Sequence, residues 1–116
     1  LSDRAAQLIM AMPDKHFSDL TVGRLANIMN VERSKLSRQF KKQKDMTLES
    51  FIFKEKMTRA AQLLSKDDEI TVKQVSYTVG FLTSDYFSRL FKKHFGILPG
   101  KYKEFKNRGT FLPATG

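Results

Sequence analysis

Apolar residues recur every three or four positions along nearly the whole chain, a spacing that gathers them on one face of a helix. The alternation of apolar and polar residues that marks a half-buried strand is missing, and so are strong hairpin turns. The pattern therefore predicts an all-α fold with seven helices. Four helices are expected at about residues 3–12, 33–44, 47–65 and 84–95, and the others begin just after Thr21, just after Thr71 and at Pro99.

Residues at the predicted helix ends have the chemistry that helix ends need. Ser2 is expected to cap the first helix, because serine oxygens accept hydrogen bonds from the free N–H groups of a first turn. Thr71 and Gln74 have the spacing of a capping box. Gly96 suits the left-handed backbone at a helix end, and Pro99 suits a first turn.

One helical unit occurs twice, at a distance of about fifty residues. Residues 20–22 match residues 70–72, and after one extra residue in the second copy, residues 36–42 match residues 87–93. Each copy predicts a helix, a short turn and a second helix.

The turns need a residue that tolerates positive φ, and asparagine and glycine meet this need at the equivalent positions Asn30 and Gly80. Small residues that let the helices cross closely are also expected, together with apolar residues under the turn. These further pairs are Ala26 with Ser76, and Val31 with Phe81.

This arrangement is the helix-turn-helix pattern, in which the second helix enters the major groove of DNA. Two helical hairpins that pack as a plain bundle with no ligand are the alternative. We expect residues 1–46 to form the first unit, 47–66 a linker helix and 67–116 the second unit, which together make one DNA-binding domain.

Positive charge favours a polyanionic partner. The chain has 21 basic and 12 acidic residues and a formal net charge of +9. Two stretches, residues 33–44 and 89–108, hold much of the excess, whereas acid gathers at residues 67–69. Clustered basic residues are typical of nucleic-acid-binding surfaces, although basic surface can also serve solubility alone. The basic residues are Arg33, Lys35, Arg38, Lys41, Lys42 and Lys44 in the first stretch, and Arg89, Lys92, Lys93, Lys101, Lys103, Lys106 and Arg108 in the second.

The residue inventory argues against an enzyme. The chain has no cysteine, its histidines are His16 and His94, and neither a glycine-rich phosphate loop nor a paired-carboxylate motif occurs. We expect no cofactor and no metal. No apolar run approaches the ~20 residues that cross a bilayer, so no membrane contact is expected. Because the chain starts at Leu1 and not at a methionine, we expect it to be a fragment of a longer protein. We expect that protein to work in the cytoplasm, at the nucleoid.

Several motifs resemble the AraC/XylS family over about residues 8–106. The motifs are residues 37–42, the Ala-Ala-Gln-Leu-Leu run at 60–64, Val-Gly-Phe at 79–81, the run from Tyr86 to Gly96, and Pro99 with Tyr102. The resemblance implies the C-terminal DNA-binding module of a bacterial transcription regulator, more often an activator than a repressor. It also implies an N-terminal sensor, dimerisation or receiver domain outside this chain. One departure is Leu98, where the family usually has threonine.

The helix at residues 33–44 is expected to bury Leu36 and Phe40 and to turn its polar residues outward. The residues that the resemblance implies as base contacts are Ser34, Lys35, Ser37 and Arg38. Arg38 can grip guanine O6 and N7 with its two-pronged guanidinium, or it can contact a phosphate; both interpretations stay open.

The helix at residues 84–95 is expected to bury Phe87, Leu90 and Phe91. The residues that the resemblance implies as facing DNA are Ser84, Asp85, Tyr86 and Arg89. Asp85 can accept from cytosine N4, pair with Arg89 or favour the helix dipole, while Tyr86 can contact a base or be half-buried. The first basic stretch has no acid, whereas the second helix carries Asp85 on its DNA-facing side. A carboxylate near phosphates weakens binding unless it finds a donor, so we expect the second unit to bind DNA more weakly and more selectively.

A further set of hydroxyl and lysine residues is expected to contact phosphates, which positions a protein without reading sequence. These residues are Thr21, Lys41, Lys42, Thr71, Lys92, Lys93, Lys101 and Lys103. Capping alone is the alternative for the threonines, and exposure to solvent is the alternative for each lysine.

Two other functions compete with duplex reading. An exposed face that recruits RNA polymerase is one, and it can coexist with DNA binding. RNA binding is weaker, because sequence-specific RNA modules stack bases on aromatic side chains, and most phenylalanines here fall on predicted buried stripes.

Overall fold

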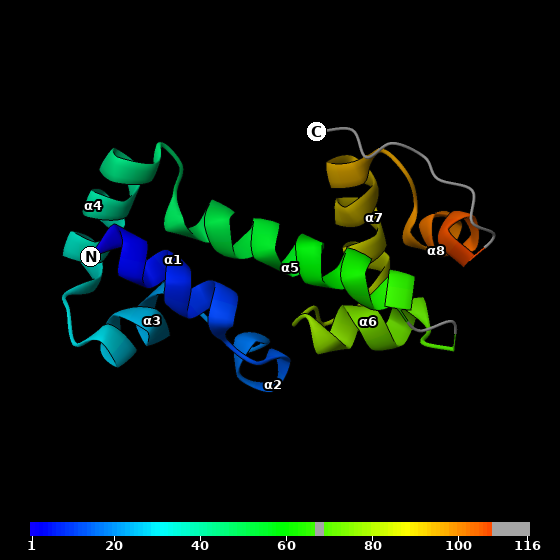
Figure 1. Cartoon of the computed structure of the whole chain (residues 1–116), viewed down its shortest axis with the longest axis horizontal. Helices are drawn as coiled ribbons and strands as arrows, with labels where there is room; N and C mark the ends of the chain where they lie inside the picture. The colour runs from blue at the N-terminus through cyan, green and yellow to red at the C-terminus, as the bar shows by residue number, and fades with distance from the viewer. Residues whose placement is uncertain (67–68, 108–116) are drawn as a thin grey trace. The chain divides into compact units, whose positions relative to one another are not determined.

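The computed structural model describes residues 1–66 and 69–107, which form eight helices and no strand (Figure 1). The predicted all-α class is confirmed. The chain divides into two compact units, residues 1–55 and 56–116. The division falls inside α5 (Leu48–Lys66), so the start of this helix belongs to the first unit and the rest to the second.

The first unit consists of α1 (Ser2–Ala11), α2 (Asp14–Phe17), α3 (Val22–Met29), α4 (Arg33–Lys44) and the start of α5. Helix α4 packs against both α3 and α1. The core of this unit is a cluster of buried apolar side chains from all five helices and the segment before α3. Its members are Ala5, Ile9, Phe17, Leu20, Val22, Leu25, Ala26, Met29, Leu36, Phe40, Leu48 and Ile52.

The single-turn helix α2 was not predicted from the sequence. It begins after Pro13, whose φ of −62° suits a helix start, and its Phe17 is buried. One turn is too short to show the repeating apolar stripe on which helix prediction depends.

The predicted cap at Ser2 is wrong, because α1 begins one residue earlier than expected. Ser2 is inside the helix and buried, and its hydroxyl has no hydrogen-bond partner among the described residues. The start of α1 is held by Asp3, which accepts a hydrogen bond from Nζ of Lys44 at the end of α4. This bond and the lysine's charge lower the pKa of Asp3.

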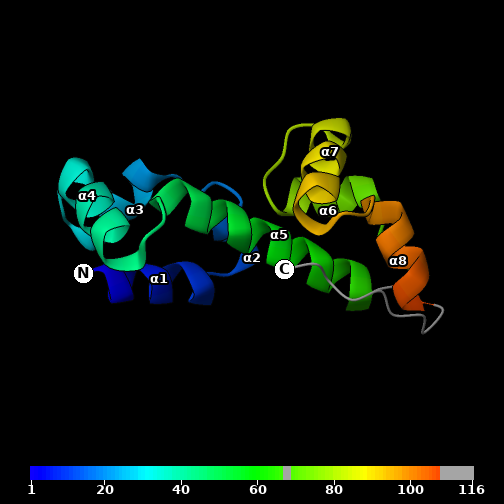
Figure 2. The same cartoon turned by 90° about the horizontal axis from the view of Figure 1, so that it is seen from above.

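The second unit consists of the rest of α5 with α6 (Val72–Thr78), α7 (Ser84–Phe95) and α8 (Pro99–Asn107) (Figure 2). Helix α7 packs against α6 and α8. Aromatic rings continue the core along α7 and across to α8: the ring centroids of Phe87 and Phe91 lie 5.7 Å apart, and those of Phe91 and Tyr102 lie 5.6 Å apart. The fully buried apolar residues are Met57, Ala60, Leu64, Val75, Val79, Phe87 and Phe91.

The turns between α3 and α4 and between α6 and α7 share one hydrogen-bond pattern. The N–H of Val31 donates to the carbonyl of Ala26 at 3.0 Å, and the N–H of Phe81 donates to the carbonyl of Ser76 at 2.8 Å. These six-residue closures are typical of helices that end in a left-handed residue. The two copies inferred from the sequence therefore share their backbone geometry at the turn.

The predicted left-handed residues are confirmed. Asn30 has φ 56° and Gly80 has φ 99°, a region in which asparagine and especially glycine are tolerated. Ala26 and Ser76 are buried, as a close helix crossing requires. The Ser76 hydroxyl donates to the carbonyl of Lys73 at 2.7 Å, which satisfies it inside the core.

Threonine side chains cap several helices. Thr21 accepts from the N–H of Arg24 at 3.1 Å, and Thr71 forms the predicted capping box with Gln74. Thr83, which was not predicted as a cap, accepts from the N–H of Tyr86 at 3.3 Å. Three free N–H groups at helix starts are thereby satisfied.

The starts of α5 and α8 occupy equivalent places in the two copies but differ in capping. Thr47 accepts from the N–H of Ser50 at 3.0 Å before α5. Before α8 the equivalent residue is Leu98, whose carbonyl accepts from the N–H of Tyr102 at 2.9 Å and whose side chain is 44% exposed. Leucine has no oxygen to offer the first turn of α8.

Replacing Leu98 by threonine should supply the missing cap. We expect Leu98→Thr to raise the free energy of unfolding by about 1 kcal/mol, measured by urea denaturation. Leu98→Val is the matched control, since valine has the shape of threonine without its hydroxyl. Equal stability of the two variants would show that no cap forms.

Candidate nucleic-acid interface

The burial of Leu36 and Phe40 sets the orientation of α4. Both are fully buried and lie four positions apart, on one face of the helix. The opposite face carries the residues predicted to meet DNA. Arg33, Ser34, Lys35, Arg38 and Lys41 are exposed, and Ser37 is half-buried.

Several of these residues share a groove of about 400 Å³ in the first unit. It is lined by Ser37, Arg38, Lys41, Lys42, Thr47, Leu48 and Glu49. The structure thus brings predicted base-contacting and phosphate-contacting residues of α4 together beside the start of α5. Three of its seven lining residues are basic, Arg38, Lys41 and Lys42, and one is acidic, Glu49. The three basic side chains come from α4, and the carboxylate comes from α5.

Glu32 was not among the residues predicted to face DNA, although it is adjacent to them in the chain. It is exposed, directly precedes α4 and makes no side-chain capping bond. Its equivalent in the second copy, Thr83, caps α7, and this correspondence was the available signal. Each of the two helices therefore starts near a carboxylate, Glu32 or Asp85, so their charges differ less than the basic stretches suggested.

Helix α7 has the same pattern of buried and exposed residues as α4. Phe87 and Phe91 are fully buried, Leu90 is half-buried, and Asp85, Tyr86 and Arg89 are exposed, with Ser84 half-buried. Phe87 and Phe91 lie on the inward face and Asp85, Tyr86 and Arg89 on the outward face, as predicted, whereas Leu90 is less buried and Ser84 less exposed than expected.

The exposed residues of α7 interact with one another. The guanidinium of Arg89 lies 5.9 Å from the ring centroid of Tyr86, a cation–π distance. The Tyr86 ring in turn lies edge-on to Phe81 at 6.1 Å. Among the described residues Asp85 has no ion pair, and it lies in the first turn of α7, where the helix dipole favours a negative charge.

The predicted phosphate-contacting residues fall into different environments. Lys92 and Lys93 are exposed in the last turn of α7. Lys101 lies 3.7 Å from Glu104, and Lys103 donates a hydrogen bond to the carbonyl of Ile70, which joins α8 to the segment before α6. The capping bonds of Thr21 and Thr71 use the hydroxyl oxygen as acceptor, so the O–H can still donate. Asp67, Asp68 and Arg108, which the charge pattern included, lie outside the described residues.

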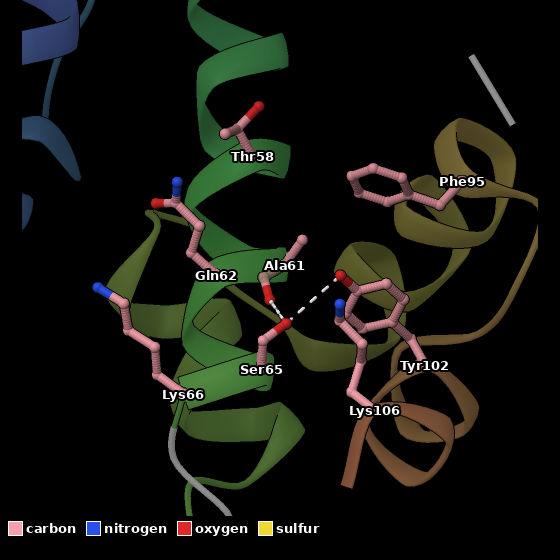
Figure 3. A pocket seen from close by; sticks show the side chains of 8 residues that line it. All are labelled: Thr58, Ala61, Gln62, Ser65, Lys66, Phe95, Tyr102 and Lys106. Carbon is pink, nitrogen blue, oxygen red and sulfur yellow. Dashed lines mark hydrogen bonds between the residues drawn. The ribbon is translucent and has the colours of Figure 1, made fainter. Parts of the chain in front are cut away.

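A second hollow, of about 360 Å³, lies in the second unit between α5, the end of α7 and α8 (Figure 3). The Ser65 hydroxyl points across it, donating to the carbonyl of Ala61 at 2.8 Å and lying 3.4 Å from the Tyr102 hydroxyl. Its lining residues are Thr58, Ala61, Gln62, Ser65, Lys66, Phe95, Tyr102 and Lys106. This lining includes no carboxylate and no histidine, so it offers no acid–base pair.

Two further titratable side chains, Lys56 and His94, lie near aromatic rings. Burial lowers the pKa of Lys56, whose ammonium lies 5.3 Å from the Phe81 ring centroid. His94 lies edge-on to Phe95 at 4.7 Å. Within residues 1–66 and 69–107 no group of three potential metal ligands comes together, and no helix there is long and apolar enough to span a membrane.

Comparisons with known proteins agree with this geometry. A family profile described as a helix-turn-helix domain matches residues 25–104. The Msm operon regulatory protein of Streptococcus mutans is 34% identical over 91 residues, which cover 78% of this chain and 32% of that protein. The chain therefore spans about a third of this relative's length.

Solved structures show the same fold. The C-terminal domain of AraT, a response regulator from Geobacillus stearothermophilus, aligns with a TM-score of 0.76 and 32% identity, over 99% of this chain and 90% of that one. A transcriptional regulator with an AraC-type DNA-binding domain from Chromobacterium violaceum aligns with a TM-score of 0.78 and 24% identity, over 90% of this chain and 89% of that one. The second likeness concerns the fold alone.

These relatives are transcription regulators rather than enzymes, and the profile covers both helix-turn-helix units. The family resemblance expected from residues 37–42 and 86–96 is confirmed. The chain belongs to the AraC-type family of helix-turn-helix transcription regulators and is a DNA-binding domain of that family.

Proposed function

We propose that one copy of this chain reads duplex DNA by placing α4 and α7 in successive segments of the major groove. The observation that carries the proposal is the pattern of buried and exposed residues that α4 and α7 share. In each, a pair of buried residues four positions apart turns a polar, cation-bearing face to solvent. Helix α5 supports the proposal, because its 19 residues make a connector of about 28 Å, comparable to the ~34 Å repeat of the groove.

The proposed contacts follow the two exposed faces. Arg38 reads guanine through O6 and N7, and neighbouring residues read adjacent base edges. The base-reading set is Ser34, Lys35, Ser37, Arg38, Ser84, Asp85, Tyr86 and Arg89. The phosphate-contacting set is Thr21, Lys41, Lys42, Thr71, Lys92, Lys93, Lys101 and Lys103.

We propose further that the parent protein is an activator of bacterial transcription that works in the cytoplasm at the nucleoid. Its additional sequence would form an N-terminal sensor, dimerisation or receiver domain. The greater length of the Msm operon regulatory protein supports this arrangement, and so does the origin of the AraT domain in a response regulator. RNA polymerase is the proposed protein partner, and its contact is compatible with DNA binding.

The first prediction concerns the DNA site. Because two different helices read it, the preferred site should be non-palindromic, cover about 20 base pairs, roughly two turns of the duplex, and bind one chain. Selection from a random duplex pool gives the site, and native mass spectrometry gives the stoichiometry. Single-stranded RNA of the same sequence is the control competitor. A palindromic site filled only by two copies would contradict the proposal.

The second prediction separates reading from positioning. Arg38→Ala should relax preference at one or two base pairs, each by about 1–3 kcal/mol, if the contact to guanine is bidentate. Lys93→Ala should weaken binding to all duplexes alike and reduce the salt slope by about one unit. Competition titrations with single-base variants of the site measure both effects. If Arg38→Ala also scales every duplex equally, Arg38 contacts the backbone.

The third prediction concerns the carboxylate of α7. Asp85→Asn should raise the affinity for random duplex and reduce the difference between this affinity and the affinity for the preferred site. The reason is that a carboxylate near phosphates weakens binding to sequences that offer it no hydrogen-bond donor. The gain should be largest at low salt, where charges are least screened.

Glu32→Gln is the matched control, since it removes one negative charge at the start of α4. Titrations of both duplexes at two salt concentrations compare the variants. Unchanged random-duplex binding by Asp85→Asn would show that Asp85 serves the helix dipole and does not face DNA.

A further inference from the structure

The second helix-turn-helix copy contains one residue that the first copy lacks, and the structure identifies it as Leu82. Val31 and Phe81 are equivalent because each closes its turn with the same backbone bond. Glu32 and Thr83 are equivalent because each directly precedes the second helix of its copy. Val31 and Glu32 are adjacent, whereas Leu82 stands between Phe81 and Thr83.

Leu82 is 92% exposed, although its position in the chain favours burial. An apolar residue just before a helix cap commonly packs on the fourth residue of the helix, which in α7 is Phe87. Phe81 takes that role, with its ring 5.4 Å from Phe87. In the first copy Val31 packs against the core directly before Glu32. The fold therefore has no place for the extra leucine, and its side chain lies in solvent.

The surroundings of Leu82 are those of the proposed base-reading surface. Thr83, Ser84 and Asp85 follow it directly, and Tyr86, four residues on, is 51% exposed. Residues at the start of a recognition helix are the ones that meet base edges. The apolar feature of the major groove is the C5-methyl group of thymine, which aliphatic side chains contact.

We infer that Leu82 is a specificity-determining residue that contacts a thymine methyl group in the part of the DNA site read by α7. The inference rests on the proposed function. Leu82 is the exposed aliphatic side chain just before α7, between the half-buried Phe81 and the polar Thr83. One aliphatic side chain fits a single methyl group on a base edge better than it fits a protein interface, which has an apolar centre of several residues. The first copy has no counterpart, so this preference belongs to one end of the site.

The test uses the preferred duplex with each thymine replaced in turn by deoxyuridine, which lacks the 5-methyl group and keeps every hydrogen-bonding group. With the unaltered chain, one or two replacements in the α7 end should weaken binding about fourfold, the effect expected for one buried methyl-sized group. With Leu82→Ala, the same replacements should have no effect. The affinity of Leu82→Ala for the original duplex should fall by a similar factor.

Leu98→Val is the control, because Leu98 is an exposed leucine of the same unit that precedes α8 rather than α7. It should keep the deoxyuridine pattern of the unaltered chain. Urea denaturation of Leu82→Ala should show unchanged stability, since the removed atoms are in solvent.

Two results would overturn the inference. In one, Leu82→Ala retains the full deoxyuridine sensitivity. In the other, no thymine at the α7 end is sensitive to loss of its methyl group, which would leave Leu82 as a protein-contacting residue. Failure of the proposed function is distinguishable, because the unaltered chain would then select either no preferred duplex or a palindromic one filled only by two copies.

Discussion

The burial of two side chains four residues apart, in α4 and again in α7, is the constraint on which the proposed DNA-reading faces depend. Leu36 and Phe40 fix the rotation of α4, and Phe87 and Phe91 fix that of α7. A helix that rotated about its axis would expose these residues and lose their hydrophobic stabilisation, about 1.5–3 kcal/mol for each fully buried side chain. The buried residues therefore hold the polar faces of α4 and α7 toward solvent, and interactions among the polar side chains are not needed to fix the rotation of either helix.

The turn before each helix adds a second constraint, because it determines where the helix begins. Equivalent backbone bonds close the two turns, and Asn30 and Gly80 supply the left-handed residue. The copies then diverge between turn and cap. The two turns thus share one backbone geometry, but the first exposed residue after the turn is Glu32 in the first copy and Leu82 in the second.

The sequence predicted the features that follow from the repeated unit and from the spacing of apolar residues. The helix spans of α4 and α7, their buried faces and the left-handed turn residues were all recognisable from spacing. Features confined to a single turn or to one side chain were not recognisable: α2 is too short to show a period, and Ser2 resembles a cap although it is the first residue of the helix. The hydrogen bond from Lys103 to Ile70 joins segments far apart in sequence, and no local pattern indicates it.

Helix α5 contributes to both cores, and this sharing limits how the chain can be divided. Leu48 and Ile52 complete the first core, whereas Met57, Ala60 and Leu64 complete the second. Trimming the chain at residue 46 would open a cavity in the first unit, since it would remove Leu48 and Ile52 together with Phe51, which packs against the same core. The backbone bonds of α5 also run without interruption from one core to the other. Melting either unit therefore frays a helix that its neighbour needs, which makes the unfolding of the two units mutually dependent.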